Sequence, residues 1–290
     1  MLEAMARARI RAFFQCLTAF GLAAACATFG QTAHARTLYF PHEDARFLHP
    51  NQKNGGAVVL PEVGSEEALP LVVFLHGTNS AGDLHLWLGG GRKDLRPAIA
   101  RFIASGSVRP FVFAAPSHTK HAALPRKVWS GFELHAFIED AMRATEGQVK
   151  IDRNRVVLAG HSGAGCNPSG GLSSDYWSAG APLPVAVVSV DPCLDGLMGA
   201  ALSRRPVGVP LLLWWQRAVW VRQPAKFTAA LLRDRPEERV DRVTELPAIG
   251  PNPHDAILPV ALETSLRELL GTAQAEEQAQ EPRSSASDSG

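Results

Sequence analysis

A short apolar segment near the middle of the chain runs directly into a row of small residues, and this junction limits the folds that the chain can adopt. Residues 155–159, Arg-Val-Val-Leu-Ala, have the length and β-branched content of a buried strand. Residues 160–165, Gly-His-Ser-Gly-Ala-Gly, follow without a break. Small residues at 160 and 164 leave room for a sharp turn from strand to helix around Ser162. Alanine stands at 164 where such turns usually have glycine, but it adds only a methyl group. The pattern predicts that Ser162 is exposed at the end of a buried strand.

Apolar segments alternate with amphipathic ones along the chain, which is typical of strands interleaved with helices and predicts an α/β fold. The predicted strands are residues 37–40, 57–60, 71–75, 111–114, 155–159, 185–190, 209–215 and 239–246. The predicted helices are residues 95–105, 132–145 and 262–270. The first two strands are bounded by proline or by a glycine-asparagine cluster, so we expect them at the edges of the sheet. Pro168 predicts that the helix after Ser162 is short or kinked.

The first 35 residues have the layout of a signal peptide. Three arginines precede an apolar stretch at 12–29 that contains no charge, and small residues at Ala33 and Ala35 predict cleavage after Ala35. Two alternatives remain open: a membrane anchor formed by the apolar stretch, and lipid attachment at Cys26. With cleavage, we expect an exported protein, periplasmic or secreted, without stable membrane insertion.

Residues 36–271 are expected to form one domain, because no linker or repeat divides them. Residues 272–290 contain almost no large apolar side chain and are expected to be a disordered tail. Loss of residues 1–35 would remove three arginines and one glutamate, which changes 29 basic and 28 acidic residues to 26 and 27. This balance gives no reason to expect a nucleic-acid partner.

Two cysteines, Cys166 and Cys193, remain after residue 35. An even number of cysteines in an exported protein indicates a disulfide. Two buried free thiols are the alternative, because cysteine also serves as a small apolar residue in protein cores.

The turn around Ser162 and its preceding strand resemble those of the α/β-hydrolase family, in particular secreted esterases, lipases and polyester depolymerases. The resemblance extends over about residues 69–270 and implies an α/β-hydrolase fold: a mostly parallel central sheet flanked by helices on both faces. It also implies that Ser162 is a nucleophile. The segment His76-Gly77-Thr78 follows an apolar strand at the place where this family has its oxyanion loop, so the backbone N–H groups of Thr78 and Gly163 are the expected oxyanion donors.

The family orders its catalytic residues serine, acid, histidine along the chain. His254 is the only one of the ten histidines that follows Ser162, and it lies where the family places its base, on a loop after the last strand and before a closing helix. We therefore expect His254 to be the general base.

The acid has two candidates. No carboxylate follows the strand that ends at Trp215, whereas Asp191 closes the preceding strand and is followed by proline, as in pancreatic-type lipases. Asp191 is the expected acid and Asp195 the alternative. A Cys166–Cys193 bridge would join the segment after the nucleophile to the loop that carries Asp191.

The resemblance implies a serine hydrolase that cleaves carboxylic esters, small or polymeric, through an acyl-enzyme. A peptidase or an acyltransferase on the same fold is the alternative, as is a hydrolase-like binding protein without catalysis. Residues 118–121, His-Thr-Lys-His, lack a third metal ligand and no HExxH pattern is present, so we expect neither a metal nor a cofactor.

Overall fold

The computed structural model describes residues 35–42, 55–62, 67–78, 94–117, 124–173, 183–218, 222–233 and 241–273. The chain divides into two compact units, residues 1–33 and residues 34–290, and every described residue belongs to the second. The expected signal peptide up to residue 34, the alternative lipid site at Cys26 and residues 274–290 of the expected tail lie outside the described residues. Within the described ranges, no helix is both long enough and apolar enough to cross a membrane.

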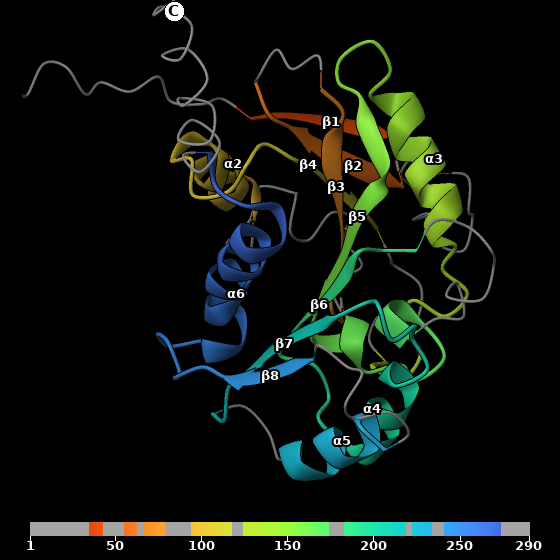
Figure 1. The fold of residues 1–290 in the computed structure, drawn as a ribbon, viewed down its shortest axis with the longest axis vertical. Helices are drawn as coiled ribbons and strands as arrows, with labels where there is room; N and C mark the ends of the chain where they lie inside the picture. Colours follow the sequence, from red (N-terminus) through yellow and green to blue (C-terminus); the bar gives the residue numbers. More distant parts are fainter. Residues whose placement is uncertain are drawn as a thin grey trace, which may run out of the picture. The chain divides into compact units, whose positions relative to one another are not determined.

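Eight strands form one sheet in the order β1-β2-β4-β3-β5-β6-β7-β8 (Figure 1). The strands are β1 (Arg36–Phe40), β2 (Gly56–Leu60), β3 (Leu69–Leu75), β4 (Val112–Pro116), β5 (Ile151–His161), β6 (Ala186–Val190), β7 (Leu211–Trp215) and β8 (Arg242–Glu245). Strand β2 pairs antiparallel with β1 and β4, and all other pairs are parallel. All eight predicted strands are therefore present, and the sheet is mostly parallel as expected.

Helices cover both faces of this sheet, which confirms the predicted α/β class (Figure 1). Helices α2 (Arg96–Ala104) and α6 (Pro253–Leu270) pack on one face, and α3 (Leu134–Ala144), α4 (Gly196–Leu202) and α5 (Pro224–Leu231) pack on the other. The sheet separates two apolar clusters because successive side chains of a strand point to opposite faces. In β3, for example, Leu71 and Val73 join one cluster and Val72 joins the other.

Two expectations about the elements are wrong. Strand β2 is not an edge strand: it lies between β1 and β4 and is buried throughout. Its side chains are apolar on both faces, so Val58 and Val59 enter opposite clusters. Helix α6 begins at Pro253 rather than at residue 262 and contains Pro259. Proline is favourable at a helix start, and its usual effect as a helix breaker at 259 is outweighed here by burial of Ile257 and Leu258.

The parallel strands direct their carboxyl ends to the same edge of the sheet, where ligands bind in open α/β folds. Strand β5 ends immediately before Ser162, β6 immediately before Asp191, and β7 immediately before Gln216. Residues that are far apart in the sequence are thus collected at one edge.

Candidate active site

Ser162 lies in the sharp turn that the sequence predicts. Strand β5 ends at His161, and a 3-10 helix of one turn follows (Ser162–Gly165). The backbone φ of Ser162 is 54°, a left-handed conformation that is uncommon for residues other than glycine. A Cβ atom on Gly160 would lie 2.9 Å from the Cβ of Ala164, so the turn needs glycine at this position. The helix ends before Pro168, which confirms the prediction of a short helix.

The segment His76-Gly77-Thr78 packs directly against this turn. A Cβ atom on Gly77 would lie 2.7 Å from the Cβ of Ser162, and one on Gly163 would lie 2.9 Å from the backbone nitrogen of Thr78. Both glycines are therefore required by close approach of the two backbones. Gly163 is also in the first turn of a helix, where N–H groups have no acceptor within the helix. The structure thus brings the backbones of the two expected oxyanion donors, Thr78 and Gly163, together.

Trp129 contacts His76, the residue before Gly77. Nothing in the sequence pattern singles Trp129 out. Its side chain is fully buried, and its indole N–H donates a 2.8 Å hydrogen bond to the backbone oxygen of His76. The indole also meets the His76 ring edge-on, with the ring centroids 5.0 Å apart. These two contacts anchor the backbone of residues 76–78 to the buried Trp129.

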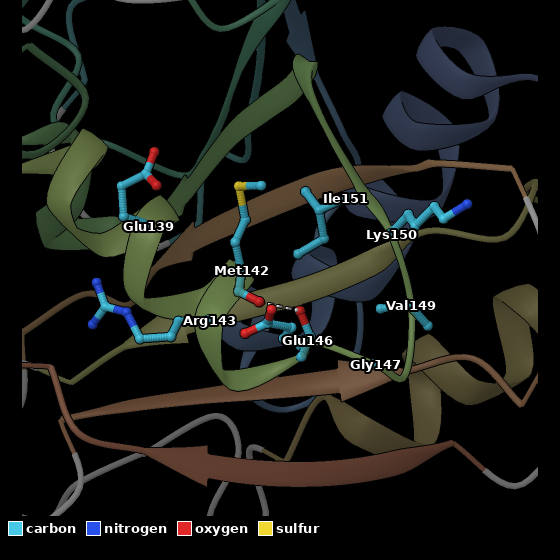
Figure 2. A pocket seen from close by; sticks show the side chains of 9 residues that line it. Glu139, Met142, Arg143, Glu146, Gly147, Val149, Lys150 and Ile151 are labelled. Atoms are coloured by element: carbon cyan, nitrogen blue, oxygen red, sulfur yellow. Dashed lines mark hydrogen bonds between the residues drawn. The ribbon is translucent and has the colours of Figure 1, made fainter.

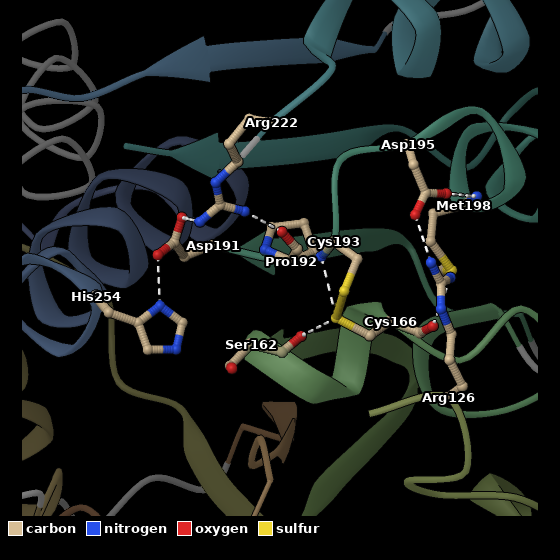
Figure 3. Close-up of a disulfide and its surroundings, with 10 residues drawn as sticks. All are labelled: Arg126, Ser162, Cys166, Asp191, Pro192, Cys193, Asp195, Met198, Arg222 and His254. Atoms are coloured by element: carbon tan, nitrogen blue, oxygen red, sulfur yellow. Dashed lines mark hydrogen bonds and ion pairs between the residues drawn. A yellow bond between two sulfur atoms is a disulfide. The ribbon is translucent and has the colours of Figure 1, made fainter. Parts of the chain in front are cut away.

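His254 and Asp191 form a direct hydrogen bond. Nδ1 of His254 lies 2.5 Å from Oδ2 of Asp191, whose side chain is completely buried, whereas the side chain of His254 is 16% exposed. Because a carboxylate accepts, Nδ1 carries the hydrogen, and Nε2 of the neutral ring is then a proton acceptor. In Figure 3, the ring nitrogen of His254 that does not contact Asp191 lies on the side of the Ser162 hydroxyl. His254 is in the first turn of α6 rather than on the loop before it, because α6 begins earlier than the sequence predicts.

The carboxylate of Asp191 has further partners besides His254. The side-chain amide of Gln216 donates to Oδ2 at 2.9 Å, and the guanidinium of Arg222 forms an ion pair with Oδ1. Burial would raise the pKa of Asp191, but the hydrogen bonds from His254 and Gln216 and the charge of Arg222 outweigh it, so this pKa lies below its ordinary value. Asp191 is thus held as an anion. Its backbone φ of 49° is again left-handed.

Asp195, the alternative acid, is used elsewhere. One of its oxygens accepts from the backbone N–H of Met198 at 3.0 Å and caps the N-terminus of α4. The other lies 2.5 Å from the guanidinium of Arg126. In Figure 3 the Asp195 side chain points to Arg126 and not to His254. The structure therefore brings Asp191, rather than Asp195, to the histidine.

His161 links the serine turn to His254. Its Nε2 donates to the backbone oxygen of His254 at 2.9 Å, and the two rings lie 4.4 Å apart between centroids. Burial and the neighbouring His254 lower the pKa of His161 to about 3. His161 is therefore a neutral ring. Because Ser162 directly follows His161 in the chain, this hydrogen bond ties the start of α6 to the serine turn.

Cys166 and Cys193 form a disulfide, with their Cα atoms 4.9 Å apart. The alternative of two free thiols is thus not what the structure shows. Cys166 immediately follows the 3-10 helix of Ser162, and Cys193 is two residues after Asp191 (Figure 3). The bridge joins the serine turn to the loop that carries the buried carboxylate.

Ligand atoms of His161, His254 and Asp255 lie within 4.8 Å of one another, a spacing that suits a metal ion. Each of the two rings already uses one nitrogen for a hydrogen bond, His161 to a backbone oxygen and His254 to Asp191. We therefore assign no metal to these three side chains.

A hollow of about 480 Å³ lies elsewhere, between α3 and the start of β5 (Figure 2). Its lining includes Met142, Glu146, Val149 and Ile151. Since Ile151 begins β5 and Ser162 follows its end, the hollow is at the opposite end of this strand from the serine. It is therefore not part of the candidate active site.

No protein-family model and no curated protein matches the sequence. Solved structures nevertheless share its fold. A ferulic acid esterase is 15% identical, with a TM-score of 0.53 over 82% of this chain and 98% of the other. The fluorophosphonate-binding serine hydrolase F of Staphylococcus aureus is 12% identical, with a TM-score of 0.52 over 83% and 99%. A CE1 ferulic acid esterase from Anaeromyces mucronatus is 15% identical, with a TM-score of 0.50 over 82% and 93%.

At such low identity the likeness concerns the fold. The strand order, the mostly parallel sheet and the helices on both faces agree with it. The resemblance seen around Ser162 in the sequence is thereby confirmed at the level of three-dimensional structure. The chain has the α/β-hydrolase fold shared by these esterases and serine hydrolases.

Proposed function

We propose that this protein is a serine hydrolase that cleaves carboxylic esters through an acyl-enzyme on Ser162. The observation that carries the proposal is the 2.5 Å hydrogen bond between His254 and the buried Asp191, next to a strained Ser162 turn. A serine, a histidine and a carboxylate in this relation form the arrangement that activates a serine hydroxyl. Two of the structures with the same fold are named ferulic acid esterases, which supports ester hydrolysis over other acyl transfers.

In the proposed reaction, Nε2 of His254 accepts the proton of the Ser162 hydroxyl while Oγ forms a bond to the ester carbonyl carbon. The carbonyl oxygen becomes an oxyanion, which the N–H groups of Thr78 and Gly163 stabilise. The C–O bond to the alcohol then breaks, and the imidazolium returns the proton to the departing oxygen. Water attacks the acyl-enzyme by the same route, with His254 again as the base, and releases the carboxylic acid and Ser162. Asp191 orients the ring and stabilises the imidazolium.

Labelling with a fluorophosphonate followed by peptide mapping tests this assignment. We expect the label on Ser162 and, in Ser162→Ala, a loss of p-nitrophenyl acetate hydrolysis of at least ~1,000-fold. Ser169→Ala is a matched control, because Ser169 is an exposed serine seven residues further along the chain and should leave both readouts unchanged. Unreduced turnover by folded Ser162→Ala would overturn the proposal.

The substrate is proposed as a small or polymeric carboxylic ester. Methyl ferulate is a suitable first test beside simple alkyl esters, because ferulic acid esterases are among the structures with this fold. A matching amide substrate distinguishes an esterase from a peptidase, and a competing alcohol acceptor distinguishes hydrolysis from acyl transfer to that alcohol.

We also propose that the protein is exported, with cleavage after Ala35. The Cys166–Cys193 disulfide fits an oxidising compartment. The mass of the mature protein tests this proposal: cleavage after Ala35 gives a chain that begins at Arg36, whereas lipid attachment would leave a modified Cys26 at the N-terminus. Mature protein outside the cytoplasm that still carries residues 1–35 without modification would contradict both.

A further inference from the structure

Arg222 is a buried cation that the proposed reaction does not use. Its side chain is 3% exposed, and it pairs with the fully buried carboxylate of Asp191. The same guanidinium donates to the backbone oxygen of Pro192, the next residue along the chain. Burying a charge is unfavourable unless it is paired and hydrogen-bonded, and the loop of Asp191 and Pro192 gives Arg222 both an ion pair and a hydrogen bond.

The two oxygens of Asp191 have different partners. Oδ1 receives the guanidinium of Arg222 and the backbone N–H of Gln216, the latter at 3.3 Å. Oδ2 receives Nδ1 of His254 at 2.5 Å and the side-chain amide of Gln216 at 2.9 Å. Figure 3 shows Arg222 and His254 on separate oxygens of the carboxylate. A planar carboxylate held through one oxygen has little freedom to rotate, so Arg222 fixes where the other oxygen lies.

Resting on the proposed function, we propose that Arg222 is a positioning residue: it turns Asp191 toward His254, and its charge sets the acid limb of the pH–rate profile. Arg222 suits this role because its fork of donors reaches the carboxylate and the Pro192 carbonyl at once. By contacting both the side chain of Asp191 and the carbonyl of the next residue, Arg222 also restrains the left-handed backbone of Asp191.

The charge of Arg222 acts against that of Asp191. Without the guanidinium, the full negative charge of the carboxylate would favour the imidazolium form of the adjacent histidine, which cannot accept the serine proton. Among the described residues, the other titratable groups that face this pair are His161 from β5 and Asp255 from α6. Neither is substituted in the Arg222 variants, so both are common to the parent and variant profiles.

The experiment compares pH profiles of kcat/KM for p-nitrophenyl acetate in the parent, Arg222→Gln and Arg222→Lys. Arg222→Gln should shift the acid limb to higher pH by about half a unit to one unit, and should lower kcat at the plateau about tenfold. Arg222→Lys keeps the charge but loses the planar fork, so kcat should fall several-fold while the limb stays in place.

Arg126→Gln is the matched control. Arg126 pairs with Asp195 in the same loop and donates to the backbone oxygen of Cys166 at 3.0 Å, but it does not contact Asp191. Its loss removes an ion pair near the disulfide, and the acid limb should not move. A limb that moves in Arg126→Gln and not in Arg222→Gln would overturn the proposal.

An equal loss of activity at every pH in folded Arg222→Gln, with an unmoved limb, would also overturn it and leave Arg222 a purely structural residue. If Arg222→Gln does not fold, Arg222→Lys decides: kcat, KM and limb all equal to those of the parent would refute the positioning role. These outcomes are separate from the serine assignment, because inactive Ser162→Ala together with an unshifted Arg222→Gln refutes only the role of Arg222. Active Ser162→Ala would refute both.

Discussion

Nδ1 of His254 lies 2.5 Å from Oδ2 of Asp191, although 63 residues separate them in the chain. The first belongs to the start of α6 and the second follows β6, and these two elements pack against each other. The carboxylate is fully buried and accepts four hydrogen bonds from three residues, whereas the imidazole retains some exposure. The pair therefore combines a fixed anion with a ring that is partly open to solvent.

Asp191→Asn should lower kcat strongly, whereas Asp195→Asn should leave kcat nearly unchanged. Asparagine at 191 cannot accept from Nδ1 as a charged partner and favours the wrong tautomer of His254, so kcat should fall about 1,000-fold or more. Asparagine at 195 still caps α4 but loses the charge beside Arg126, so kcat should stay within about threefold of the parent. Steady-state kinetics on both variants checks this. A larger loss of kcat in Asp195→Asn would show that the acid has been assigned to the wrong aspartate.

Gly77→Ala should lower activity far more than Thr78→Ala. The new methyl group at 77 would lie 2.7 Å from the Cβ of Ser162 and push the segment of the proposed oxyanion donor Thr78 away from the turn. We expect a loss in kcat of about 100-fold, the size found when one oxyanion donor is lost. Thr78 is proposed to act through its backbone N–H, so removal of its side chain should change kcat by less than about threefold. Similar losses in the two variants would contradict a backbone donor at 78.

The protein should lose stability as the pH falls below neutral, because His161 is buried as a neutral ring. Its pKa is lowered from the ordinary 6.5 to about 3, so the unfolded chain binds a proton that the folded chain does not over this window. Stability from this residue is complete above pH 6.5 and decreases as the pH falls toward 3, by about 2 kcal/mol between pH 7 and pH 5.

Urea unfolding of the parent and of His161→Gln at these two pH values measures this contribution. Glutamine does not titrate, so the variant should lose about 2 kcal/mol less than the parent over the same interval. His135→Gln is the control, because His135 lies on α3 and does not contact His254 or its surroundings. An identical pH dependence in the parent and His161→Gln would show that His161 does not carry the effect.

Removal of the disulfide should affect both stability and catalysis. The bridge closes a loop with a sequence separation of 27, and its loss through Cys166→Ala/Cys193→Ala should lower the free energy of unfolding by about 3 kcal/mol. Because it joins the serine turn to the Asp191 loop, kcat should fall several-fold at temperatures where the variant is still folded. Denaturant unfolding and kinetics at 20–25 °C check both effects. An unchanged kcat would restrict the bridge to a structural role.

Local patterns in the sequence predict a large part of this fold. Apolar β-branched segments such as 155–159 become strands because burial on both faces suits those side chains in a parallel sheet. The turn at Ser162 is predictable because small residues on both sides are needed for close packing, which the Gly160–Ala164 approach confirms. Two features are not predictable in this way: the position of β2 inside the sheet and the start of α6 at Pro253. Both depend on which distant strands and helices cover their apolar side chains.

Residue patterns along the chain are enough to predict the α/β class, the strand that leads to Ser162, and His254 as the single histidine after it. The three-dimensional arrangement is needed to show which aspartate meets that histidine, and it reveals the contacts of Trp129, His161, Gln216 and Arg222. Secondary structure follows from local burial and backbone preference, whereas the partner of a buried charge depends on strands and helices far apart in the chain. The carboxyl ends of β5, β6 and β7 meet at one edge of the sheet. The side chains that follow these strands pair there according to their distance and charge.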